Sequence, residues 1–183
     1  VGVQVFTRVL GKSIADEGFR PLFDELAAHG VPAWLHPVFD ERKPDNNIVF
    51  SWEYELTQAM FQMVQTGLFR VHPGLKVIVH HAGAMAPFFA GRIDRILPPE
   101  QSADFRCFYA DTAILGNTPA LELAADFFGV DHMVFGTDAP LGILPAGATK
   151  EIGAAIDAMR LSDAEREAIY ARNYQRIVGT HEG

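Results

Sequence analysis

The chain has 183 residues, a globular composition and an excess of acidic side chains. Hydrophobic residues make up 49% and charged residues 21% of it, which excludes a largely disordered chain and allows one sizeable core. The net charge of −8 disfavours nucleic acid and anionic membranes as partners.

Cys107 is the only cysteine, so an intramolecular disulfide framework and a cysteine-built zinc site are excluded. No apolar run approaches the roughly 20 residues that a membrane-spanning helix needs, and the first residues do not resemble a signal peptide. We therefore expect a cytoplasmic protein that acts on a small molecule, with no membrane or nucleic-acid partner.

Five short apolar segments, rich in β-branched and aromatic residues, are predicted to be buried strands. In chain order they are 3–6, 33–35, 76–80, 108–110 and 133–135. Between them, apolar residues recur at helical spacings of three and four in the segments 19–26, 52–63 and 121–128. Strands that alternate with helices predict an α/β fold with a parallel sheet. Because no linker or repeat divides the chain, residues 1–183 are expected to form a single domain.

Side chains that bind metals or transfer protons follow four of the five predicted strands. They are His36, the pair His80 and His81, Asp111, and Asp138. The carboxyl ends of parallel strands meet at one edge of a sheet, so these side chains are expected to lie together. Imidazole and carboxylate are the ligands of catalytic Zn²⁺ and related ions. Each residue alone has an ordinary explanation, such as a helix cap, but their recurrence at consecutive strand ends favours a site.

The motifs around these residues resemble those of the amidohydrolase-related family of metal-dependent hydrolases and decarboxylases. This family includes aminocarboxymuconate semialdehyde decarboxylase and the resorcylate decarboxylases. The motifs are WLHP at 34–37, VHHAGA at 79–84, FYADT at 108–112, FGTDAP at 135–140 and NYQRI at 173–177. The resemblance covers essentially the whole chain and implies a (β/α)₈ barrel of the TIM type, with a divalent metal, most simply zinc, at its C-terminal mouth.

Carried over to the matching positions, the resemblance implies a role for each site residue. His36, at the end of the fifth barrel strand, would be a metal ligand, and His81, at the end of the sixth, would be the acid/base beside the metal water. Asp138, at the end of the eighth, would bind the metal and orient that water. Gly83 would let the backbone pass close to substrate. Arg92 would hold a substrate carboxylate or form a structural ion pair, and we favour the structural role.

One family motif is missing from the sequence. The family supplies two further metal ligands from a His-x-His motif after the first barrel strand, and the chain contains no His-x-His. If 3–6 is the fourth barrel strand, the chain is a partial barrel of five parallel βα units, corresponding to strands four to eight, and complete barrels have about 250 residues. We expect weakened or lost metal binding. We also expect open sheet edges that are covered in a homo-oligomer or that belong to a longer gene product.

Two functions are consistent with these residues. The first is a metal-dependent hydrolase or non-oxidative decarboxylase that acts on a small carboxylated or carbonyl substrate through metal-activated water. The alternative is a truncated, catalytically inactive barrel fragment that serves only as a folded scaffold. Hydrolysis and decarboxylation use the same ligands, so the sequence does not separate them. A nucleotide-binding open sheet is disfavoured, because no Gly-rich phosphate loop follows a strand.

Overall fold

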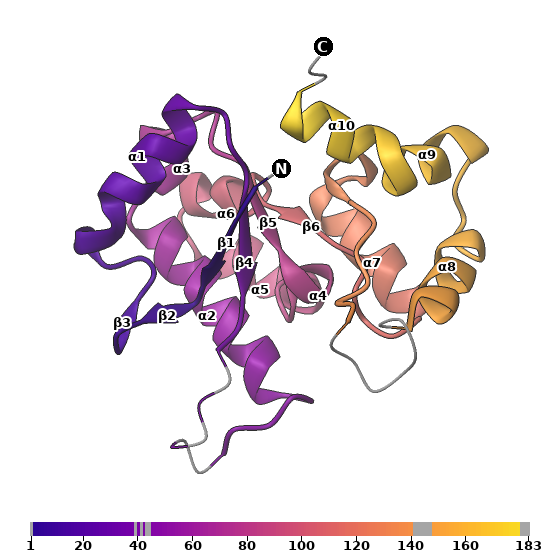
Figure 1. The fold of residues 1–183 in the computed structure, drawn as a ribbon, viewed down its shortest axis with the longest axis horizontal. Helices are drawn as coiled ribbons and strands as arrows, with labels where there is room; N and C mark the ends of the chain where they lie inside the picture. Colours follow the sequence, from indigo (N-terminus) through magenta and orange to yellow (C-terminus); the bar gives the residue numbers. More distant parts are fainter. Residues whose placement is uncertain (1, 39, 41, 43–44, 141–147, 180–183) are drawn as a thin grey trace.

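A computed structural model describes residues 2–38, 40, 42, 45–140 and 148–179. Its central feature is a parallel sheet with helices packed on it (Figure 1). The strands, in spatial order, are β1 (Val3–Phe6), β4 (Ala33–His36), β5 (Val77–Val79) and β6 (Tyr109–Ala110). A small antiparallel hairpin follows β1 and consists of β2 (Arg8–Val9) and β3 (Lys12–Ser13). The predicted α/β class and the first four predicted strands are confirmed.

The fifth predicted strand, 133–135, is reduced to one parallel bridge between Ala110 and Met133. The reason is that residues near the C-terminus form hydrogen bonds with the backbone groups of this segment. The Asn173 side-chain amide donates to the Met133 carbonyl at 2.7 Å, and the Phe135 N–H donates to the Ile169 carbonyl at 2.9 Å. The described sheet therefore has four strands plus a bridge, and not the five complete strands expected.

The helices that follow the strands agree with the predicted segments 19–26, 52–63 and 121–128. The α-helices of the described residues are α1 (Arg20–Ala28), α2 (Ser51–Gln65), α3 (Leu68–Val71), α4 (His80–Gly83), α5 (Ala90–Ile96), α6 (Pro99–Phe105), α7 (Thr118–Phe128), α8 (Thr149–Asp157), α9 (Asp163–Glu167) and α10 (Asn173–Val178). Shorter 3-10 turns are η1 (Glu17–Phe19), η2 (Pro87–Phe89) and η3 (Val130–His132), and a π-helix, η5 (Ala168–Arg172), joins α9 to α10. None of the helices in the described ranges is both long and apolar enough to cross a membrane.

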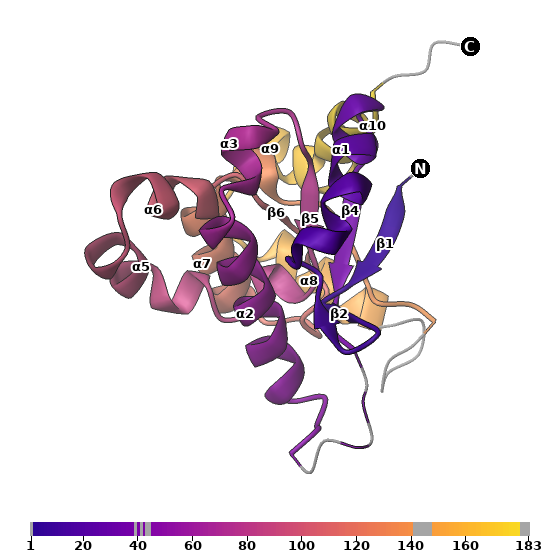
Figure 2. The same ribbon diagram turned by 90° about the vertical axis from the view of Figure 1, so that its left-hand side faces the viewer.

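The two faces of the sheet are covered differently. Figure 2 shows α2, α3, α5 and α6 on one side of the strands, where alternate strand residues such as Leu35 and Val79 form the main core. Residues between them, such as Trp34 and Ile78, point to the other face. There they pack with Ile177 of α10 in a small second cluster. This second face leads, at the carboxyl ends of the strands, to the predicted site residues.

Candidate metal centre

The strand register places three polar residues at the same level of the sheet. Leu35 pairs with Val79, and Val79 pairs with Ala110, so the next residues on these neighbouring strands are His36, His80 and Asp111. The His36 and His80 rings lie edge to face with centroids 4.9 Å apart, and His80 Nδ1 lies 2.8 Å from Asp111 Oδ2. The expected meeting of side chains at the strand ends is thus observed.

His81 reaches the same place by a different route. In a regular strand it would point to the opposite face from His80. Its backbone, however, adopts left-handed angles of φ 59° and ψ 49°, and positive φ values continue through Ala82, Gly83 and Ala84. Non-glycine residues in this region are strained, and such strain is concentrated at functional sites. The turn brings the His81 ring to 5.6 Å from the His36 ring, measured between centroids.

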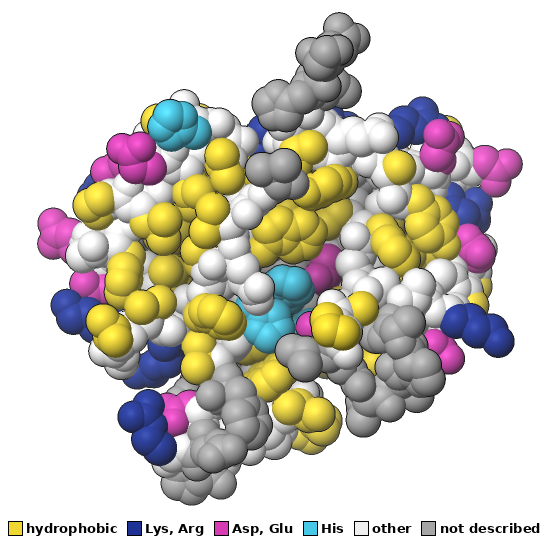
Figure 3. All heavy atoms as spheres, in the orientation of Figure 1, with side chains coloured by type: hydrophobic (Ala, Val, Ile, Leu, Met, Phe, Trp, Pro, Cys, Tyr) yellow, Lys and Arg dark blue, Asp and Glu magenta, His cyan; other side chains and the backbone are white. Residues whose placement is uncertain are grey.

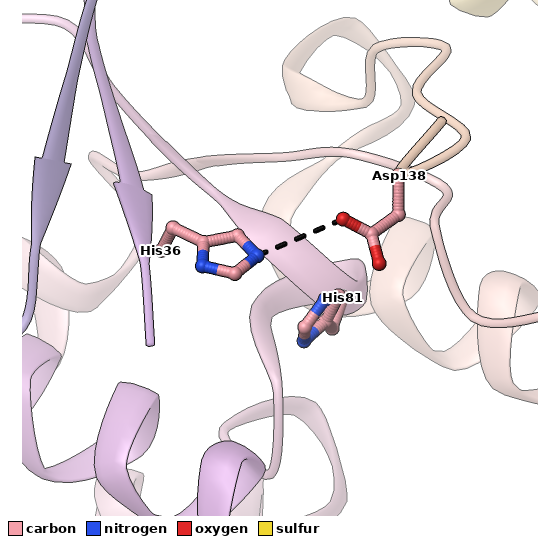
Figure 4. A group of neighbouring side chains, drawn as sticks. All are labelled: His36, His81 and Asp138. Carbon is pink, nitrogen blue, oxygen red and sulfur yellow. Dashed lines mark ion pairs between the residues drawn. The ribbon is translucent and has the colours of Figure 1, made fainter. Parts of the chain in front are cut away.

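Asp138 completes the group, from the segment after the Met133 bridge. Its Oδ1 lies 3.6 Å from Nε2 of His36, and Figure 4 shows both facing the space beside His81. One ligand atom from each of His36, His81 and Asp138 lies within 4.8 Å of the others. Ligand atoms held at about 2.0–2.2 Å from one cation are about 3–4 Å apart, so a small inward movement makes this set fit a divalent ion.

Hydrogen bonding prepares His36 for this role. Its Nδ1 lies 2.8 Å from the carbonyl of Pro37, to which it donates, and this leaves the lone pair of Nε2 facing Asp138. Burial lowers the pKa of His36, and the neighbouring His80 and His81 lower it further, while the Pro37 carbonyl and Asp138 oppose them. A neutral imidazole is the form that binds metals, so this environment favours a ligand.

His81 has the opposite electrostatic character. Its Nδ1 lies 2.9 Å from Oε1 of Glu53, which is in the first turn of α2, although the N–H is not fully aligned. Burial alone would lower the pKa of His81, but the carboxylates of Glu53, Asp111 and Asp138 together outweigh burial and raise it. His81 is therefore suited to hold a proton near neutral pH, as an acid must.

Two features of the site were not assigned a role from the sequence. Glu53 was missed because it lies on a helix, and no strand-end pattern marks it. The pairing of His80 with Asp111 was also missed, although the His-His doublet and the strand spacing contained a signal. Asp111 is 1% exposed and accepts a hydrogen bond from the Ala113 N–H at 3.0 Å. Burial raises the pKa of Asp111, but His80 and His81 outweigh it and the net shift is downward.

His36, Glu53, His81 and Asp138 line a cavity of about 580 Å³, whereas His80 and Asp111 are not part of its lining. Its lining also includes Trp52 and a set of apolar residues, among them Ile48, Val49, Ile114 and Leu115. Figure 3 shows imidazole side chains near the middle of one face, bordered by hydrophobic side chains. Among the described residues that line the cavity, none is lysine or arginine. A small, largely apolar ligand with a polar end fits such a space.

Gly83 and Arg92 are not brought to this cavity in the way the resemblance implied. Gly83 has φ +75°, and a Cβ there would lie 2.3 Å from the Phe128 ring, so the close approach in the structure is to α7. Arg92, on α5, lines a separate cavity beside Phe89 and Ile93. A substrate contact by either residue stays a prediction.

Comparison with known proteins identifies the class. The family model described as Amidohydrolase matches residues 1–180, and the chain belongs to this family. The predicted resemblance is thereby confirmed.

Particular relatives are named as decarboxylases. The chain is 29% identical over 160 residues to 6-methylsalicylic acid decarboxylase of Penicillium expansum, covering 76% of this chain and 48% of that protein. It is 26% identical over 163 residues to 2-amino-3-carboxymuconate-6-semialdehyde decarboxylase of Dictyostelium discoideum, covering 80% of this chain and 45% of the relative. The chain thus spans about half the length of these curated relatives.

A solved structure shares the fold. The dihydroxybenzoic acid decarboxylase of Polaromonas sp. JS666, solved with bound manganese and the inhibitor 2-nitroresorcinol, matches with a TM-score of 0.78 and 21% identity. The match covers 93% of this chain and 56% of that one. The described elements therefore share the α/β fold of this solved structure, and the expected partial barrel of five βα units stays a prediction.

Proposed function

We propose that this chain carries part of the active site of a metal-dependent, non-oxidative decarboxylase that acts on a small aromatic or unsaturated carboxylate. The observation that carries the proposal is the convergence of His36, His81 and Asp138, with ligand atoms within 4.8 Å of one another, on one wall of a cavity. The decarboxylase names of the relatives favour loss of CO₂ over hydrolysis.

In this proposal His36 and Asp138 are the metal ligands. His36 offers Nε2, and Asp138 offers a carboxylate oxygen that lies 3.6 Å from it. A divalent cation held by these two residues would supply positive charge for substrate oxygen atoms and for developing negative charge. The described cavity lining has no lysine or arginine, so this charge would meet the substrate carboxylate. Imidazole and carboxylate are donors that zinc accepts, and manganese is bound in the Polaromonas structure.

His81 is the proton donor. When the bond between the ring carbon and the carboxyl carbon breaks, the electron pair stays on the ring carbon and CO₂ leaves. His81 then gives its proton to that carbon, which restores a neutral product. The surrounding apolar residues, with Trp52 at one side, hold the substrate ring and exclude water.

Metal binding and turnover test the proposal together. Zinc or manganese binding is measured by calorimetry, and CO₂ release is measured with a panel of hydroxybenzoic acids. We expect His36→Ala and Asp138→Ala each to weaken metal binding by tenfold or more and to abolish turnover, whereas His81→Gln should keep the metal and lose turnover. Metal binding that both ligand variants leave unchanged would contradict the site. Metal binding without any turnover would favour the folded-scaffold alternative.

A further inference from the structure

Glu53 is the one carboxylate of α2 that lines the cavity, and it faces His81. Its side chain is 25% exposed and that of His81 is 8% exposed. Oε1 and Nδ1 lie 2.9 Å apart, within hydrogen-bond range although the N–H direction is not fully aligned, and a carboxylate at this distance favours a proton on Nδ1. Nε2 is then the nitrogen of His81 that is left for the cavity.

The chain gives His81 little other support. Its backbone has left a regular strand, and four consecutive residues from His81 to Ala84 have positive φ. The turn is instead fastened to α2, because the Met85 N–H donates to Thr57 Oγ1 at 3.0 Å. The Trp52 ring lies nearly parallel to the His81 ring, at 4° and 6.4 Å between centroids. One helix thus supports the turn, flanks the ring and places the carboxylate.

We propose that Glu53 is a positioning residue, which fixes the Nδ1–H tautomer and the orientation of His81 so that Nε2 faces the substrate. This inference rests on the proposed function, because it gives His81 the role of proton donor. A carboxylate or carbonyl that holds the second nitrogen of an active-site histidine is a general device for selecting its tautomer. Here the partner comes from a helix that is distant in sequence from the strand end.

The first test reads the tautomer without any substrate or metal. Long-range ¹H–¹⁵N spectra of the chain separate Nδ1–H from Nε2–H imidazoles, and His81→Gln identifies the His81 signals. The spectra are recorded at alkaline pH, where the ring is neutral, and there we expect Nδ1–H for His81 in the unaltered chain. Glu53→Ala should shift it to Nε2–H, the form that predominates in free imidazole side chains, and Glu53→Gln should retain Nδ1–H through its amide oxygen.

Glu122→Ala is the matched control. Glu122 also lies on a helix and in an ion pair, with Arg160, and its side chain is 21% exposed, close to the value for Glu53. It should leave the His81 signals unchanged. An Nε2–H signal in the unaltered chain, or a His81 spectrum that Glu53→Ala does not alter, overturns the proposal.

The second test uses turnover once a substrate is found. Glu53→Ala should lower kcat by about 10²-fold with little change in KM or metal content, and Glu53→Gln should restore part of it. An unchanged kcat overturns the positioning role. If the unaltered chain decarboxylates nothing, the proposed function fails, and the tautomer spectra still decide whether Glu53 orients His81.

Discussion

His80 and Asp111 form a largely buried pair beside the candidate metal ligand His36, with His80 Nδ1 2.8 Å from Asp111 Oδ2. Asp111 is 1% exposed, and its other oxygen accepts the Ala113 N–H. The pair joins the carboxyl ends of β5 and β6. His81 is the next residue after His80 in the chain. The pair therefore supports the turn that carries His81.

Removal of the Asp111 carboxylate should strongly destabilise the fold. Asp111→Ala leaves His80 without its partner and the Ala113 N–H without an acceptor, and breaking a buried pair costs about 3 kcal/mol or more. Urea unfolding measures the change. The control is Asp24→Ala, because Asp24 also lies 2.8 Å from a histidine, His72, but is 51% exposed. Its loss should cost less than about 1 kcal/mol, and equal losses in the two variants would contradict the prediction.

The contribution of Asp111 should also depend on pH in a defined direction. Its pKa is lowered in the folded chain, whereas an unfolded aspartate has a pKa of about 3.9. The folded state therefore binds the proton less readily, and the carboxylate stabilises the fold fully above about pH 4. As the pH falls further, through the folded-state pKa, this stabilisation is lost. The difference in unfolding free energy between the unaltered chain and Asp111→Asn should shrink below about pH 4, and it should also shrink above about pH 6.5, where His81, whose pKa Asp111 helps to raise, loses its proton. A difference that grows in acid would contradict the assignment.

The sequence was sufficient for the elements whose signal is local. Apolar runs located β1, β4, β5 and β6 to within two residues, and the strand ends predicted that His36, His81 and Asp138 lie together, as they do in the structure. Local patterns could not predict that the backbone of Met133 and Phe135 bonds to C-terminal residues in place of a neighbouring strand. The residues that form these hydrogen bonds, Ile169 and Asn173, are distant in sequence.

The roles of Glu53, His80 and Asp111, which contact the candidate site residues, could not be predicted from the sequence for a related reason. The role of Glu53 depends on a left-handed turn at His81, and that turn becomes visible only in three dimensions. The pairing of His80 with Asp111 depends on the register between β5 and β6. Periodicity predicts which residues are buried in an element, but not which residue of a neighbouring element lies opposite.

Gly83 can be tested for its role in the structure, which is close packing against the Phe128 ring. A Cβ at position 83 would lie 2.3–2.4 Å from two atoms of the Phe128 ring, and φ there is +75°. Gly83→Ala should therefore lower the unfolding free energy by about 2 kcal/mol or more, measured by urea unfolding. In Gly83→Ala/Phe128→Leu the clash is relieved, so the double variant should be less destabilised than the sum of its parts.

Gly91 is the control glycine for this experiment. It lies within α5, and a Cβ at this position would meet nothing within 4 Å. Gly91→Ala should stabilise the chain by about 0.5–1 kcal/mol, because alanine favours helices. If Gly83→Ala is as well tolerated as Gly91→Ala, the close approach to Phe128 does not exist.

The exposed edge of β1 predicts self-association. In the described part of the chain, β1 pairs with β4 on one side only, and Val3 and Phe6 are 40% and 44% exposed. The N–H groups of Val3 and Thr7 donate toward β4, so by alternation those of Gln4 and Phe6 face the open edge. Unpaired edges of this kind recruit other strands, and a second copy offers the same edge for an antiparallel pair. We therefore expect this edge to be covered either by further strands of a longer gene product or, in the chain as given, by a second copy, which sedimentation at micromolar concentration would detect as a homodimer.

A proline at position 4 tests this edge without disturbing the sheet. Gln4→Pro removes the outward N–H, and proline is tolerated in an edge strand where that group faces away from the ladder. The variant should sediment as a monomer, whereas Gln4→Ala, which keeps the N–H, should remain dimeric. A monomeric unaltered chain would contradict the prediction directly. A dimer that survives Gln4→Pro would mean that the association uses another surface, such as the apolar cavity lined by Phe89 of η2 and Ile93 of α5.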